Sequence, residues 1–283
     1  RLYKAVNKLA EEDPEIAKAA RLETAKLHEG DPENLALWNE FMPWCLADLK
    51  KIYDRLDISF DQQHGESFYQ PMLGAVVDEL LKAGIAEPSE GAICVFYRDA
   101  TKTDEEGKPL QRMPPMIVRK ADGAFTYATS DLACIRYRAE QFDPNVVVYV
   151  VDDRQSLHFE QLFTTARSWG YAGMNLVHVA FGKITDKQGR PYKTREGTTV
   201  GLSDLLDEAV SRSLAKLEEL YSNLPPDQQL SKEECRAISE AVGIGAVKYA
   251  DLSQNRASDY VFDWNKMVAL DGNTSPYLQY VYA

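Results

Sequence analysis

The stretch NVVVYVVDDRQSLHFEQLFTTARSWGYAGMNLVHVAF, residues 145–181, decides the fold class. It begins with a continuous apolar run over 145–151, which is typical of a parallel strand covered on both faces. A helical pattern follows over about 155–169, and a second strand, LVHVAF, is expected at 176–181. This strand–helix–strand alternation predicts a doubly wound α/β domain.

The sequence before this stretch predicts further strands and two helices. Residues 129–142 and 72–83 are expected to be helical, with Gly84 ending the second of these. The polar segment 101–111 has the composition of a surface hairpin. Four short runs are expected as strands: ISFD (58–61), AICVFY (92–97), MIVRK (116–120) and AFTY (124–127).

Both ends of the chain are expected to be helical. Residues 1–56 show apolar positions at three- and four-residue spacing, and Asp31-Pro32-Glu33 is typical of a helix start. LHEG (27–30) is interpreted as the end of the preceding helix. Three regions are therefore predicted: a helical one at 1–57, an α/β one at 58–202 and a helical one at 203–283. Because the sequence starts with Arg1 and ends on an aromatic stretch, we interpret it as part of a longer protein.

The composition is that of an ordinary globular protein, with 45% hydrophobic and 27% charged residues among 283. No apolar run approaches the roughly 18 residues that cross a membrane. The four cysteines and four histidines are scattered, which predicts reduced thiols, a cytoplasmic location and no metal site. The net charge of −12 argues against nucleic-acid binding in general, although one basic stripe would remain compatible with it.

Three segments bring polar side chains to the ends of predicted strands, where ligands bind in this fold class. They contain Glu66 in HGES, Tyr127 and Asp131 in TYATSD, and Gln155 and His158 in DDRQSLH. Each has a plainer interpretation. An acid at a helix start complements the helix dipole, and a glutamate beside a glycine in a loop is commonly just solvated.

A fourth segment, GKITDKQGRPYKTREGTTV (182–200), is rich in cations and glycines. A flexible cationic loop at such a sheet edge suits a polyphosphate. Taken alone, however, the segment would be better interpreted as a solvated hairpin that turns at Gln188-Gly189.

Five segments in this order resemble the arginyl-tRNA synthetase family: YATSDLACIRYR, VVDDRQSLHFEQLF, HVAFGKITDKQGRPYKTREGTTVGLSDLLDEA, AVGIGAVKYADLSQNRASDYVFDW and GNTSPYLQYVYA. The resemblance implies the second half of a Rossmann-like catalytic domain at 58–202, flanked by helical segments. It also implies activation of L-arginine by ATP with Mg²⁺, then transfer to tRNA(Arg).

The resemblance assigns roles residue by residue. Arginine would be bound by Glu66, Tyr127, Asp131 and Gln155. ATP would be bound by His158, Lys193 and Thr194, although packing on a helix face is an equal alternative for His158. Lys193 and Arg195 would act in catalysis, in a KTREG loop that departs from the Lys-Met-Ser-Lys-Ser pattern of the class.

One departure leaves alternatives open: the His-Ile-Gly-His motif of the class does not occur in this sequence. The isolated chain is therefore expected to be inactive. The main alternative is a non-catalytic, synthetase-like module that binds arginine or tRNA. A synthetase for another amino acid is a third reading, with lysine as the competing substrate. No membrane partner is expected, and the protein is expected to be a monomer.

Overall fold

The computed structural model describes residues 2–103, 107, 109–185, 201–222, 225, 228–261, 263, 269 and 272–283. The chain divides into two compact units, Arg1–Ser59 and Phe60–Ala283, which are described separately below. The three-region division expected from the sequence stays a prediction.

The first unit consists of three helices, α1 (Leu2–Glu12), α2 (Pro14–Glu29) and α3 (Pro32–Arg55). Gly30 ends α2 with a φ of 85°, a left-handed conformation that glycine adopts without steric cost. Asp31 then caps α3 by accepting hydrogen bonds from the backbone N–H groups of Glu33 and Asn34, at 3.1 Å each. The helix end at Gly30 and the helix start at Asp31 confirm both sequence predictions.

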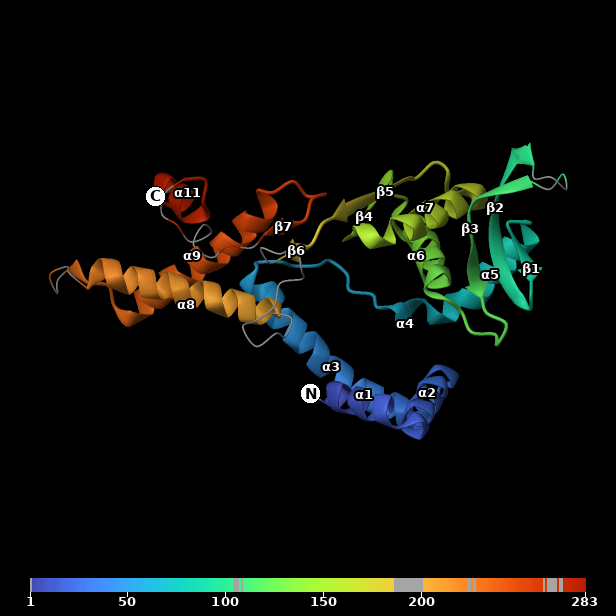
Figure 1. The fold of residues 1–283 in the computed structure, drawn as a ribbon, viewed down its shortest axis with the longest axis horizontal. Helices are drawn as coiled ribbons and strands as arrows, with labels where there is room; N and C mark the ends of the chain where they lie inside the picture. The colour runs from blue at the N-terminus through green and yellow to red at the C-terminus, as the bar shows by residue number, and fades with distance from the viewer. Residues whose placement is uncertain are drawn as a thin grey trace. The chain divides into compact units, whose positions relative to one another are not determined.

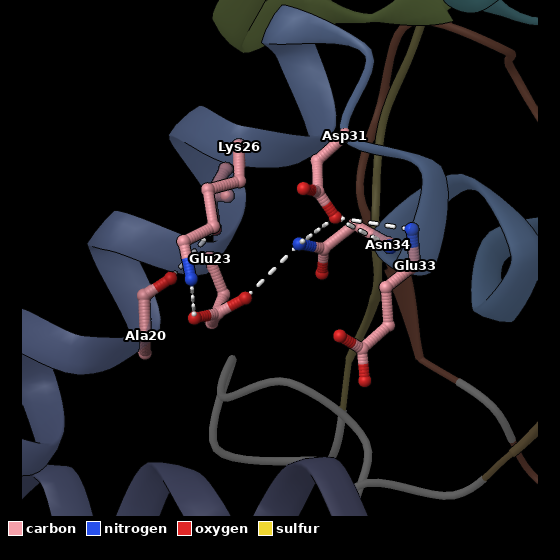
Figure 2. Close-up of polar contacts among 7 residues, drawn as sticks. Ala20, Glu23, Lys26, Asp31, Glu33 and Asn34 are labelled. Atoms are coloured by element: carbon pink, nitrogen blue, oxygen red, sulfur yellow. Dashed lines mark hydrogen bonds and ion pairs between the residues drawn. The ribbon is translucent and has the colours of Figure 1, made fainter.

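Side chains also connect α2 to α3 (Figure 2). Asn34 donates to Glu23 at 3.0 Å, and Lys26 donates to the other oxygen of the same carboxylate at 2.7 Å. These two hydrogen bonds lower the pKa of Glu23 below its ordinary value. The junction between the two helices is therefore polar.

An irregular segment rather than a strand runs across the division between the two units at Ser59 and Phe60. Residues 58–61 have no strand partner, so the prediction of a strand at ISFD was wrong. The run is too short for its hydrophobic periodicity to identify a strand, and its apolar side chains Ile58 and Phe60 are exposed.

An antiparallel sheet with the order β1-β2-β3 follows, seen at one end of the ribbon in Figure 1. Val76, Val77 and Leu80 of the helix before it are completely buried in its core. The expected hairpin around 101–111 is confirmed by the pairing of β2 with β3. The elements are α4 (Glu66–Tyr69), η1 (Gln70–Met72), α5 (Leu73–Lys82), β1 (Ala86–Ser89), β2 (Ala92–Thr103) and β3 (Pro109–Arg119).

The predicted strand AFTY is reduced to a single bridge between Arg119 and Phe125. The chain instead enters α6 (Tyr127–Phe142) two residues earlier than expected. Tyr127 is thus the first residue of a helix rather than the last of a strand. It still lies on the same helix face as Asp131, since residues four apart are neighbours.

The deciding stretch forms the parallel pair that the sequence predicts: β4 (Val146–Asp152) and β5 (Asn175–Phe181). They are joined by η2 (Asp153–Gln155), α7 (Ser156–Ala166) and a π-helical turn, η3 (Arg167–Tyr171). Tyr149 packs against Phe159 and Phe163 of α7, with ring centroids 5.2 and 5.4 Å apart.

Only one face of β4 is covered within the described chain. Val147 and Tyr149 are buried, whereas Val146, Val148 and Val150 are 51–65% exposed. The expectation of two covered faces is wrong for the described chain. Successive side chains of a strand point to opposite faces, and the hydrophobic core lies on the face of Val147 and Tyr149.

The remaining elements are helical apart from one short parallel pair, β6 (Ile184–Thr185) with β7 (Tyr260–Val261). The predicted helix after residue 202 is confirmed as α8 (Leu202–Tyr221). It lies beside α9 (Lys232–Leu252), which begins with a capping box between Ser231 and Glu234 (Figure 1). The last helix is α11 (Ser275–Tyr282). None of the described helices is both long and apolar enough to cross a membrane.

Candidate active site

A cavity of about 720 Å³ opens within the second unit, between α4, α6, the end of β4 and the start of α7. Its lining includes Glu66, Tyr127, Asp131, Gln155 and His158, so the structure brings together five of the residues singled out from the sequence. Their roles stay predictions. The rest of the lining consists of His64, Tyr69, Ser130, Cys134, Arg138, Tyr149, Val151, Arg154 and Phe159.

In the lining of this cavity a carboxylate contacts an imidazole. His158 Nε2 lies 2.7 Å from Asp131 Oδ2. The histidine is buried, with 8% of its side chain exposed, whereas Asp131 retains 37% exposure. The ring of Tyr127 lies 4.8 Å from the imidazole, centroid to centroid. Both side chains line the cavity, and the acid is the more exposed of the two.

Glu66 and Gln155 reach the cavity from two short helical segments. Glu66 is the first residue of α4, where a negative charge complements the helix dipole, and it is exposed. Gln155 is the last residue of η2, directly before α7, at the carboxyl end of β4. That strand end is where a sheet of this kind binds ligands.

Sequence reasoning missed two cavity residues, Arg138 and Tyr149. The Arg138 guanidinium carbon lies 5.0 Å from the centre of the Tyr149 ring, a cation–π distance. Burial raises the pKa of Tyr149, which keeps the phenol neutral, and among the described residues its hydroxyl has no hydrogen-bond partner. The sequence does hold a signal: Arg138 lies seven residues, or two turns, after Asp131 on α6.

Arg154, which also lines the cavity and was not singled out from the sequence, already has a counter-ion. It donates to both oxygens of Asp152, at 2.5 and 3.0 Å. These bonds lower the pKa of Asp152 to about 2. The charges of Arg154 and Asp152 therefore neutralise each other. The charge that a ligand meets in the cavity depends on the remaining ionic side chains, Glu66, Asp131 and Arg138.

The cationic loop falls outside the described residues. Lys193, Thr194 and Arg195, the residues expected to bind and act on ATP, lie within 186–200 and so outside them. The chain leading into that loop is described and is held by a distant segment. Gly182 N–H donates to the Arg256 carbonyl at 2.9 Å, and Lys183 N–H donates to Asp259 at 2.7 Å.

The ligand groups that metal ions use in proteins are chiefly His, Cys, Asp and Glu side chains. Among the described residues, no group of three or more of these side chains is arranged to hold a metal ion. All four cysteines, Cys45, Cys94, Cys134 and Cys235, are free thiols. Burial raises the pKa of the Cys134 thiol, which lines the cavity in its protonated form.

Two carboxylates that converge on one cavity beside an aromatic ring can bind a planar cation. In agreement with this, residues 1–264 match the family described as tRNA synthetases class I (R), catalytic domain. The chain belongs to that family.

Its curated relatives are arginine–tRNA ligases. The chain is 49% identical to the one from Rhodopirellula baltica, over 98% of this chain and 40% of the relative. It is 47% identical to the one from Alcanivorax borkumensis, over 99% of this chain and 47% of the relative. The chain thus spans less than half the length of these relatives.

Solved structures agree with this family. The crystal structure of arginyl-tRNA synthetase from Plasmodium falciparum superimposes with a TM-score of 0.73 at 29% identity. The superposition covers 98% of this chain and 44% of that one. The Thermus thermophilus arginyl-tRNA synthetase matches with a TM-score of 0.71 at 18% identity, covering 96% and 49%, and supports the fold alone.

Proposed function

We propose that a protein of full family length carrying this chain is an arginine–tRNA ligase. It activates L-arginine with ATP to arginyl-adenylate and transfers the arginine to tRNA(Arg). The observation that carries the proposal is the convergence of Glu66 and Asp131 on one cavity that Tyr127 and Gln155 also line. The names of the curated relatives support it independently.

The cavity suits arginine for a physical reason. A guanidinium is planar, always charged and presents five N–H donors in a fixed fork. Asp131 and Glu66 supply acceptors for that fork, Tyr127 covers its plane or adds a hydrogen bond, and Gln155 binds the α-amino group. Lysine cannot satisfy forked acceptors, so it would leave buried groups unpaired, a discrimination that can reach roughly 10⁴-fold.

In this proposal ATP enters as its magnesium complex, since Mg²⁺ favours phosphate oxygens and water over an all-protein cage. Lys193, with Thr194 and Arg195, stabilises the charge that develops on the α-phosphate and the departing pyrophosphate. The carboxylate of arginine is the nucleophile, so no covalent enzyme intermediate is needed. The loop sequence is the support for this assignment.

The location and assembly state belong to the same proposal. We expect a cytoplasmic monomer. The four free thiols support a reducing compartment.

Arginine-dependent exchange of pyrophosphate into ATP, measured with tRNA(Arg) present, tests this function. We expect exchange by the full-length protein and none by the 283-residue chain alone, because the His-Ile-Gly-His motif of the class does not occur in it. Exchange driven by lysine instead of arginine would contradict the proposed substrate.

A matched pair of variants tests the cavity itself. Asp131→Asn removes an acceptor charge facing a desolvated cation, so it should raise the KM for arginine by roughly 30-fold or more. Asp78→Asn, an exposed acid on α5 outside the cavity, should leave that KM unchanged. Equal KM values for the two variants would limit Asp131 to a structural role at its helix.

The second candidate is a non-catalytic module that binds arginine or tRNA. The combination of assembled cavity residues with the absence of the nucleotide motif from these 283 residues fits both candidates. Calorimetric binding of arginine by a full-length protein that shows no exchange would support this candidate over the ligase.

A further inference from the structure

The hydrogen bond between His158 and Asp131 joins a buried imidazole to the carboxylate that is proposed to receive the substrate. From this contact we propose that His158 is a positioning residue that fixes the Asp131 carboxylate for the guanidinium of arginine. The inference rests on the proposed function and extends it to a residue that determines specificity.

The imidazole is well placed to fix another side chain because its own position is set by packing. His158 lies on α7 with 8% exposure. The ring of Tyr127 is 4.8 Å away on one side, and that of Phe159 is 5.3 Å away, edge-on. A buried imidazole in contact with two aromatic rings keeps its N–H direction, and its hydrogen bond then fixes the orientation of the acid.

The acid needs such a partner because it is half-exposed on a helix. Asp131, with 37% of its side chain exposed, can otherwise turn between rotamers and toward water. Its contact with His158 at 2.7 Å selects one orientation before the substrate arrives. Such preorganisation reduces the cost of binding. Glu66, the other candidate acid, has no hydrogen-bond partner among the described residues that would fix it in the same way.

The proton count is consistent with this role. An ionised carboxylate only accepts, so Nε2 of His158 carries the hydrogen and donates it to Oδ2. A carboxylate offers about four lone-pair positions, and one is used here. At least two remain for the two parallel N–H groups of a guanidinium. Asp131 can therefore bind His158 and the substrate together.

This geometry separates the positioning role from the nucleotide role expected from the sequence. Since Nε2 of His158 is engaged with Asp131, contact with ATP would have to use Nδ1. The two roles thus depend on different nitrogen atoms of one ring. Glutamine places its amide nitrogen close to the Nε2 position, whereas asparagine places its own close to Nδ1.

The test uses His158→Gln, His158→Asn and His158→Leu in the full-length protein, assayed by pyrophosphate exchange with tRNA(Arg). Loss of a charge-assisted hydrogen bond should raise the KM for arginine about tenfold in the Asn and Leu variants, with a smaller change in kcat. The Gln variant should stay close to the parent. The KM for ATP should change little in all three.

Several outcomes would overturn the inference. A Leu variant with the parent KM for arginine would make His158 a packing residue. An Asn variant that keeps activity while the Gln variant loses it, with a raised KM for ATP, would assign the nucleotide role. Because Asn and Gln are both small amides, their comparison stands even if the Leu variant fails to fold.

A double-mutant cycle with Asp131→Ala, which removes the accepting oxygen atoms, gives the second readout. In that background, His158→Asn should change the KM for arginine less than twofold, because the contact is already lost. Fully additive effects would contradict positioning through Asp131. A parent protein without arginine-dependent exchange would overturn the proposed function and this inference together. If the parent is active and the His158 variants all keep its KM for arginine, the inference is overturned while the proposed function stands.

Discussion

The helix pair α2–α3 and the helix pair α8–α9 are joined by different kinds of contact. No residue of the 24-residue α3 is buried. At its junction with α2, Asp31 caps the helix by accepting from backbone N–H groups, and Glu23 accepts a hydrogen bond from Asn34 (Figure 2). In α8–α9 the contact is apolar. Leu206 and Ala209 are fully buried in α8, and Ile244 and Ala246 are buried in α9.

This difference separates what forms a helix from what holds two helices together. Caps and local ion pairs each contribute about 1 kcal/mol or less, and they act on one helix end. Burial of a large apolar side chain contributes several times more and links distant parts of the chain. Single substitutions should therefore have much larger effects on the second pair than on the first.

The largest effect is expected for Leu206→Ala. The side chain is completely buried, so its truncation should lower the free energy of opening α8–α9 by about 2–5 kcal/mol. Hydrogen exchange of the helix amides measures this quantity. The control is Leu49→Ala on α3, where the side chain is 45% exposed and the change should stay within about 0.5 kcal/mol. Equal losses would remove the distinction between the two pairs.

A smaller effect is expected for Gly243→Ala. A Cβ at this position of α9 would lie 2.8 Å from backbone atoms of Ala209 and Val210 in α8, so the helices would have to separate. The cost should be about 1–3 kcal/mol, in spite of the better helix propensity of alanine. Gly74→Ala in α5 meets no atom within 4 Å and should instead stabilise, by up to about 1 kcal/mol. The opposite signs are measurable by the same exchange experiment.

Asp31→Ala should cost about 1 kcal/mol and act only on the first turn of α3. The substitution removes the acceptor of the backbone N–H groups of Glu33 and Asn34. Their amide exchange should accelerate while that of later turns stays unchanged. Asp31→Asn, which keeps a capping oxygen, should restore protection. Faster exchange along the whole helix would show that the cap stabilises more than its own turn.

The smallest effect is expected for Lys50→Met. Lys50 contacts Asp54 at 2.5 Å, but the two side chains are 71% and 59% exposed. Such a pair on one helix contributes about 0.3–0.5 kcal/mol, and salt screens it. The difference between parent and variant in α3 exchange should vanish in about 1 M salt, where the Debye length is roughly 3 Å. A salt-independent difference would indicate lost packing of the lysine stem.

The sequence predicted those parts of the fold that local chemistry determines. Gly30 and Asp31 mark one helix end and the next helix start through backbone conformation and capping, which need no tertiary information. The paired strands β4 and β5 were predictable from their apolar runs. ISFD was not, because four residues carry too little periodicity to separate a strand from an irregular segment.

The exposed face of β4 shows a limit of a different kind. A run of valines predicts a buried strand but not which chain segment covers each face. Val148 and Val150 satisfy the sequence rule and still remain exposed in this chain.

The cavity was predictable where residues follow strand ends or lie one helical turn apart, as Tyr127 and Asp131 do. The pairing of Asp131 with His158 was not, since it depends on how α6 packs against α7. Arg138 and Tyr149 were missed for the same reason. The two-turn spacing from Asp131 indicates the helix face on which Arg138 lies, but no local feature of the sequence indicates that it meets Tyr149.

The parallel pairing of β6 with β7 has a consequence for the order of folding. The hydrogen bond from Lys183 to Asp259 joins residues 76 apart in sequence, whereas the cavity-lining residues all lie between His64 and Phe159. The pairing of β6 with β7, in which Ile184 faces Tyr260, closes a larger chain loop than the pairing of β4 with β5, in which Val146 faces Asn175, so it should form later. During synthesis, the cavity can thus assemble before the strand that anchors the cationic loop has left the ribosome. Pulse-labelled hydrogen exchange should show protection at β4 and β5 before it appears at β6, so the strand that leads into the loop proposed to bind ATP would mature after the first parallel pair.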